Sequence, residues 1–247
     1  MIKNDSLPTS SVFDLPLHLS SNYLAWLAQR LTKGKGGQVV TLNAEMAMLA
    51  QKNPRIHDII QQADLIVPDG AGIIFYLRLQ GRRQHRCPGI ELAADLIHHS
   101  AQQAQPYPIA FYGGAPGVAL RAADYWQSQY PQLTILANHG FLSEPEQAQW
   151  CRTLAEKQPA IIFVALGVPR QEYWIQDHRH LCPQALWMGV GGSFDVWSGE
   201  KQRAPQWFCD NHLEWLYRLY QEPWRWRRML VLPRFAWKSL YHHFRKA

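Results

Sequence analysis

The chain has 247 residues, of which 47% are hydrophobic and 18% are charged, and its formal net charge is +6. This composition excludes a disordered chain and allows a folded domain with a real core. No apolar run approaches the roughly 18 residues that span a bilayer, the start lacks a signal peptide, and the four scattered cysteines fit a reducing compartment. We expect a cytoplasmic protein, or one that binds a membrane from that side.

Strands and helices are predicted to alternate along most of the chain. In chain order, we expect a strand at 38–42, helices at 44–52 and 55–63, a strand at 64–67, helices at 71–79 and 91–103, a strand at 109–112, a helix at 118–129, and strands at 134–137, 160–166 and 186–190. This alternation implies right-handed crossovers and an α/β fold with a mostly parallel sheet and helices on both faces.

The sequence changes character after Gly199, where aromatic residues interleave with arginines. Residues 211–247 contain eight Lys or Arg against two Glu, which accounts for the whole net charge. We therefore predict an α/β catalytic core over residues 1–200 and a small helical C-terminal appendage over residues 201–247. The appendage should form two or three helices, broken by Pro223 and Pro233.

Three interpretations of this basic, aromatic tail are open. It could stack on and neutralise nucleic acid. It could lie in a bilayer interface, with Trp and Tyr at headgroup level and Arg on anionic lipid. It could also be a helical hairpin that packs on the core with solvated arginines. The residues alone favour the second and third interpretations over the first.

Polar side chains follow the first two predicted strands. Thr41 and Asn43 close the first strand, and Asp69 closes the second. Because ligands of parallel sheets bind at the carboxyl ends of the strands, these side chains are candidates for a site if the strands are neighbours. The pair Asp69-Gly70 is also common in turns and at helix caps. Asp69 could therefore have a structural role as a cap or a catalytic role as a general base.

Two glycine-rich loops also follow strands. Gly113 and Gly114 precede a helix, where backbone amides would suit a diphosphate, although the spacing is not GxGxxG and a tight turn is an equal alternative. Gly191 and Gly192 have the same ambiguity. Asp195 follows them and could accept hydrogen bonds from ribose hydroxyls.

Gln171 follows the most apolar strand and offers both a donor and an acceptor. We expect the flanking Arg170 and Glu172 only to pair with each other at the surface. No HExxH motif, Cys/His cluster or acidic pair near a strand end indicates a metal site, so none is expected.

Short motifs in these loops and in the tail occur in a defined order. They are Thr41-Leu42-Asn43-Ala44-Glu45, Pro68-Asp69-Gly70-Ala71-Gly72, Arg86 with Gly89, Gly113-Gly114-Ala115-Pro116-Gly117, Gly167-Val168-Pro169-Arg170-Gln171-Glu172, Gly189-Val190-Gly191-Gly192-Ser193-Phe194-Asp195, Arg203-Ala204-Pro205, Leu213-Glu214-Trp215-Leu216-Tyr217-Arg218, and Glu222-Pro223 with Arg225 and Arg228. Each is weak alone, but the ordered set resembles the WecG/TagA/CpsF family of bacterial glycosyltransferases over residues from about 38 to about 230.

The resemblance implies a Rossmann-like core, no cofactor, and a C-terminal appendage that meets the membrane. It implies an inverting, metal-independent transfer of N-acetylmannosamine, or a related sugar, from a UDP-sugar to a polyprenyl-diphosphate-linked amino sugar, in the synthesis of a cell-surface polysaccharide. The enzyme would then work as a peripheral protein on the inner face of the cell membrane. Whether the protein forms a homo-oligomer is left open by the resemblance.

The resemblance also assigns roles to matching residues. Asp69 would be the general base, and Asp195 would hold the uridine ribose. Thr41, Asn43 and Gln171 would hold the sugars. The residues that would face phosphates are Arg86, Arg218, Arg225 and Arg228.

Two departures and two rival functions accompany this hypothesis. Arg170 occupies a position at which the family more often has Lys, and Glu91 occupies one at which Asp is usual. Both differences bear on the preference for the donor sugar.

The rival functions are a nucleic-acid-binding protein that uses the tail, and a nicotinamide-dependent oxidoreductase, which the missing GxGxxG disfavours. Deletion after about Gln202 should leave a folded core that transfers poorly.

Overall fold

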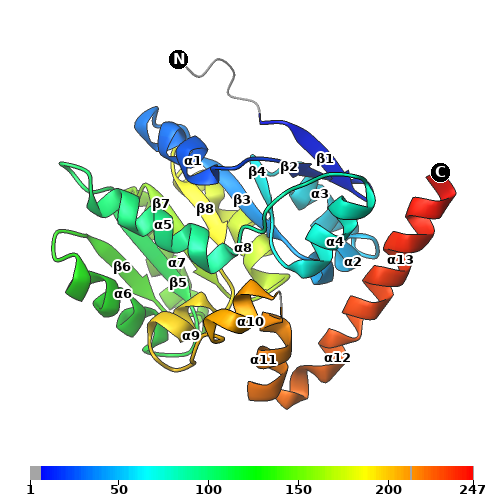
Figure 1. Ribbon diagram of the computed structural model, residues 1–247. Coiled ribbons are helices and arrows are strands. Elements are labelled where there is room, and N and C mark those ends of the chain that lie inside the picture. The colour runs from blue at the N-terminus through cyan, green and yellow to red at the C-terminus, as the bar shows by residue number, and fades with distance from the viewer. Residues whose placement is uncertain (1–6, 212, 247) are drawn as a thin grey trace.

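The computed structural model describes residues 7–211 and 213–246, apart from the side chains of Arg225 and Lys246. Its centre is a six-stranded parallel sheet with the strand order β4-β3-β8-β7-β5-β6 (Figure 1). The strands are β3 (Gly37–Leu42), β4 (Leu65–Pro68), β5 (Ile109–Gly113), β6 (Ile135–Asn138), β7 (Ile161–Ala165) and β8 (Leu186–Gly189). The prediction of a mostly parallel α/β sheet is confirmed.

Helices cover both faces of the sheet because alternate strand residues point to opposite sides. Phe111 and Phe163 pack with the helices of one face, which are α1 (Tyr23–Thr32), α5 (Gly89–Ala101), α6 (Val118–Gln129) and α9 (Ser193–Trp197). Their neighbours Tyr112 and Val164 face the other side. The helices of that side are α2 (Ala44–Ala50), α3 (Pro54–Gln61), α4 (Ala71–Leu79), α7 (Glu144–Lys157) and α8 (Arg170–His178).

An N-terminal hairpin covers the outer edge of strand β4, a feature that we did not predict. Strands β1 (Thr9–Val12) and β2 (Leu15–His18) pair antiparallel. The Nδ1 atom of His18 accepts a hydrogen bond of 3.0 Å from the backbone N–H of Ile66. The hairpin thus occupies an edge donor that would otherwise be open to another chain.

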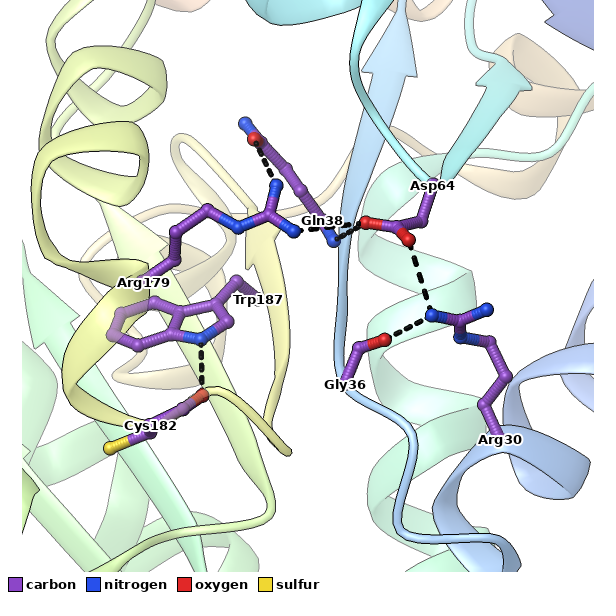
Figure 2. A network of polar contacts seen from close by, with 7 residues as sticks. All are labelled: Arg30, Gly36, Gln38, Asp64, Arg179, Cys182 and Trp187. Atoms are coloured by element: carbon purple, nitrogen blue, oxygen red, sulfur yellow. Dashed lines mark hydrogen bonds and ion pairs between the residues drawn. The ribbon is translucent and has the colours of Figure 1, made fainter.

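A polar network joins the segments at the amino ends of strands β3 and β4 (Figure 2). Asp64 accepts hydrogen bonds of 3.2 Å from Arg30 of α1 and 3.2 Å from Arg179 of the short helix η1 (Arg179–Leu181). The backbone N–H of Gln38 also donates to Asp64, at 2.8 Å. One carboxylate therefore joins these segments at the amino ends of the strands, opposite their carboxyl ends.

The tail forms α10 (Gln206–Asp210), α11 (Glu214–Gln221), η2 (Pro223–Arg225), α12 (Trp226–Met229) and α13 (Val231–Lys246). Pro223 begins η2 and interrupts the helices, as predicted. Pro233 does not break a helix, since it lies in the first turn of α13, where a backbone N–H has no helical partner to lose.

Helix α13 packs beside α2 and α4 (Figure 1). Its Phe235 is only 1% exposed, and its ring centroid lies 5.3 Å from that of Phe13 and 6.3 Å from that of Tyr76. Phe235 thus belongs to the same hydrophobic core as α2 and α4. Within the described residues, no helix has both the length and the apolar character needed to cross a bilayer.

Candidate active site

A cleft of about 650 Å³ opens at the carboxyl ends of β3, β4 and β8, and helices α11, α12 and α13 form its other wall. Asp69 and Asn43 come together there because β3 and β4 are adjacent and in register, with Leu42 opposite Pro68. The predicted site residues that line the cleft are Thr41, Asn43, Asp69, Arg86, Gln171, Gly191, Gly192, Arg218 and Arg228.

Asp69 lies at the floor of this cleft, with part of its surface open to it. Burial raises the pKa of its carboxyl group to about 6, although the positive charges of Arg86 and Arg218 act in the opposite direction. Its Oδ2 atom lies 3.4 Å from the backbone N–H of Gly89, the first residue of helix α5. Asp69 is therefore a carboxyl group that holds or releases a proton near neutral pH.

Arg86 connects the floor of the cleft to the tail. Its guanidinium group lies 3.1 Å from the carboxylate of Glu214, and only 11% of the Arg86 side chain is exposed. Arg218 lies one turn further along the same helix, α11, and also lines the cleft. The tail thereby contributes both a negative and a positive group beside Asp69.

Gln171 is 3% exposed and both ends of its amide are held by the protein. Its Nε2 donates to Glu172 at 2.8 Å, and its Oε1 accepts from the backbone N–H of Gly191 at 3.1 Å. A Cβ atom on Gly189 would lie 2.3 Å from Gln171 Nε2, so only glycine leaves room for this side chain.

Glu172 does not pair with Arg170, and this prediction was wrong. Glu172 is 3% exposed and bonds to Gln171, whereas Arg170 donates to the backbone oxygen of Leu166 at 3.0 Å. Burial raises the pKa of the Glu172 carboxyl group to about 7. Sequence reasoning missed this residue because a Glu in the first turn of a helix is usually solvated.

Thr41 and Asn43 border the cleft next to Asp69. The Oδ1 atom of Asn43 caps helix α2 by accepting from the backbone N–H of Met46 at 3.0 Å, which leaves the amide nitrogen as a donor for a ligand. Thr41 packs against the start of helix α5, since a Cβ on Gly89 would lie 3.0 Å from its methyl group.

Asp195 does not line the main cleft but a smaller cavity of about 70 Å³ beside it. The two cavities share Ile90, Gly192, Glu214 and Arg218. Lys201 donates to Asp195 at 2.8 Å and to Glu222 of the tail at 3.0 Å. The predicted ribose acceptor is thus paired with a lysine.

Gly113 and Gly114 lie outside the lining of both cavities. Gly113 has φ +130°, and a Cβ there would lie 2.4 Å from the backbone oxygen of Ala165. Gly114 donates to the same oxygen at 2.9 Å. These contacts show a close approach of the backbone at the ends of β5 and β7.

Arg228 lies 2.7 Å from Glu45 of helix α2 and so bridges the tail and the core across the cleft. Arg225, the remaining predicted residue, has its side chain outside the described part of the structure. In residues 7–211 and 213–246, His, Cys, Asp and Glu side chains form no group of three that could hold a metal ion.

A family model described as "Glycosyl transferase WecG/TagA/CpsF family" matches residues 10–247. The chain belongs to this family. It is a glycosyltransferase, and the carboxyl edge of its Rossmann-like sheet carries the motifs that the resemblance used.

Three relatives of this glycosyltransferase carry the name N-acetylglucosaminyldiphosphoundecaprenol N-acetyl-beta-D-mannosaminyltransferase. The protein of Bacillus spizizenii is 37% identical over 227 residues, which cover 91% of this chain and 84% of the relative. That of Bacillus subtilis is 35% identical over 241 residues, or 93% and 90% of the two chains. That of Staphylococcus aureus is 34% identical over 202 residues, or 81% and 78%. None of these names supports the nucleic-acid-binding alternative.

Proposed function

We propose that this glycosyltransferase transfers N-acetylmannosamine, or a related sugar, from a UDP-sugar to an N-acetylglucosamine carried on a polyprenyl diphosphate. The reaction would invert the anomeric centre, need no metal, and serve the synthesis of a cell-surface polysaccharide. The names of the relatives support the sugar and the acceptor. The observation that carries the proposal is the carboxyl group of Asp69, whose pKa is about 6, in a cleft shared with Arg86 and Arg218.

In the proposed reaction, Asp69 acts as the general base. An alcohol is a weak nucleophile at neutral pH, and a carboxylate within hydrogen-bond reach can take its proton as attack begins. The acceptor oxygen forms a bond to the anomeric carbon from the face opposite UDP, the proton passes to Asp69, and UDP leaves with the bonding electrons. A single displacement of this kind inverts the anomeric centre.

The departing diphosphate gains negative charge, and the arginines of the tail are the proposed partners for it. Arg218 and Arg228 both line the cleft, and the planar guanidinium group can bind phosphate oxygens in a bidentate way. Arg86 would hold the same charge from the core side, and Arg225 is proposed with them from its motif. Fixed positive groups in a site that excludes water can supply this stabilisation.

The remaining candidates would bind the sugars and the nucleotide. Asn43, Thr41 and Gln171 lie around the floor of the cleft, where the sugars would react. Gly191 lines the main cleft, Gly192 lines both cavities, and Asp195 would accept from the ribose hydroxyls in competition with Lys201.

The outer surface of the tail supports peripheral binding to a membrane on its cytoplasmic face. Large aromatic side chains on helices α11 to α13 are exposed beside arginines, including Tyr220, Trp224 and Trp237. Trp and Tyr favour the headgroup region and Arg favours anionic lipid. This placement would bring the cleft to the lipid-linked acceptor.

A transfer assay with a synthetic N-acetylglucosaminyl-diphosphate lipid and a panel of UDP-sugars, read by mass, tests the proposal. We expect a product heavier by one N-acetylhexosamine with UDP-N-acetylmannosamine, and the same rate in the presence of EDTA. Failure with every UDP-sugar would overturn the donor class, and loss of activity in EDTA would overturn metal independence.

A further inference from the structure

Part of the cleft lining is apolar on both walls. Helix α4 contributes Gly72 and Phe75 from the core, and α12 and α13 contribute Met229, Leu232 and Ala236 from the tail. Phe75 is 37% exposed, a large apolar side chain left open inside a ligand cleft. Sugar hydroxyls and a diphosphate bind chiefly through polar groups, whereas an isoprenoid chain binds through apolar contact.

The two walls change from charged to apolar in the same direction along the chain. On the core side, Asp69 precedes helix α4, and each residue toward Phe75 rises about 1.5 Å along the helix. On the tail side, Arg218 and Arg228 precede Leu232 of helix α13. Because α13 packs beside α4 (Figure 1), the two apolar segments line the same cleft as the charged groups.

We propose that this apolar segment of the cleft binds the first isoprene units of the lipid-linked acceptor. The inference rests on the proposed function. The acceptor combines a sugar, a diphosphate and an isoprenoid chain, and the cleft combines Asp69, the arginines and the apolar segment. The chain would lie over Phe75 of α4 and Leu232 of α13, with its diphosphate beside Arg228.

The expected role of this contact is to orient the acceptor. A bilayer is as apolar as the groove, so transfer of an isoprene unit from one to the other gains little free energy. In water without a membrane, however, the same contact removes apolar surface from solvent and should appear as affinity. A membrane-free assay therefore isolates the groove.

The first test compares two soluble acceptors, N-acetylglucosaminyl diphosphate esterified to methyl or to farnesyl, below the concentration at which the farnesyl compound forms micelles. For the wild type we expect kcat/KM to favour the farnesyl compound by at least about tenfold. Phe75→Asp should abolish most of this preference and Phe75→Leu should keep it. The matched control is Phe141→Asp, which alters a residue 66% exposed and outside both cavities and should change neither value.

Equal kcat/KM values for the two compounds in the wild type would overturn the inference, as would a full farnesyl preference in Phe75→Asp. If no UDP-sugar supports transfer to either compound, the proposed function fails instead, so the two failures are distinguishable.

A second test does not depend on how the variants fold. A farnesyl-type acceptor with a photoreactive group on its first isoprene unit is irradiated with the wild-type enzyme, and the labelled peptides are identified by mass. We expect labels in Ala71–Leu79 and in Val231–Lys246 at the end that carries Leu232. Labels confined to the outer aromatic residues, such as Trp224 and Trp237, would place the chain outside the cleft and overturn the inference.

Discussion

At Asp69, burial and neighbouring charges oppose each other. Burial raises the pKa of the carboxyl group, Arg86 lowers it and Glu214 raises it, with a result of about 6. A general base must be deprotonated, so kcat/KM for transfer should fall tenfold per pH unit below about pH 6. A pH–rate profile of the wild type measures this. A rate that stays level down to about pH 4, the ordinary range of an aspartate, would contradict the account.

Glu172 is expected to act through Gln171. Glu172→Leu leaves the Gln171 amide without its acceptor and should lower kcat/KM by about tenfold, whereas Glu172→Gln keeps an oxygen there and should restore most of the activity. In a Gln171→Ala background, Glu172→Leu should have little further effect. Kinetics of the four variants of this cycle measure the coupling. Independent, additive losses would show that Glu172 is only a core residue.

The sequence predicted the polar residues of the cleft better than their partners. Asp69 and Asn43 follow buried strands, so the topology alone brings them to one edge. The pairing of Gln171 with Glu172 could not be predicted, because adjacent helix residues usually point apart and burial depends on the packing of β8 against α8. Lys201 was missed for a similar reason, since its two carboxylate partners come from separate segments.

At the scale of elements, the parallel strands and their helices were predictable and the hairpin was not. Strands β7 and β8, for example, are apolar runs bounded by turn residues, a pattern that buried parallel strands produce. Strands β1 and β2 have only four residues each and include Pro16, so their pattern is too short to distinguish from a loop. The start of α13 was also not predicted, because Pro233 was expected to break a helix but lies in the first turn, where a helix tolerates proline.

Helix α13 should stabilise the core through one side chain. Phe235→Ala should lower the free energy of unfolding by about 3–5 kcal/mol, since it empties a site between Phe13 and Tyr76. Phe244→Ala on the same helix alters a residue 74% exposed and should change stability by less than about 0.5 kcal/mol. Chemical denaturation measures both values, and equal values for the two variants would contradict the packing described.

Phe235 also changes what deletion of the tail can show. Deletion after about Gln202 removes Phe235 and exposes apolar core residues. Loss of transfer by that truncation could therefore come from a less stable core or from the missing tail wall of the cleft. Substitution of Arg218 or Arg228, which line the cleft without filling the core, separates the two effects.

At the scale of the whole molecule, the tail should bind anionic membranes. Replacement of both Trp224 and Trp237, which are 72% and 75% exposed, by Ser should weaken sedimentation with vesicles that contain anionic phospholipid. Salt should weaken the binding of the wild type because arginines contribute to it. Phe141→Ser is the control, and undiminished vesicle binding by the double Trp variant would contradict a membrane role for this surface.

The most direct test of the account is Asp69→Asn, assayed for transfer and for UDP binding in parallel. The charged form of Asp69 is destabilised by burial, so above about pH 6 the Asn variant should be at least as stable as the wild type, and loss of activity cannot come from unfolding. The account predicts that kcat falls by at least about a hundredfold while UDP binding is retained. Transfer at a rate near that of the wild type would remove Asp69 from the role of base.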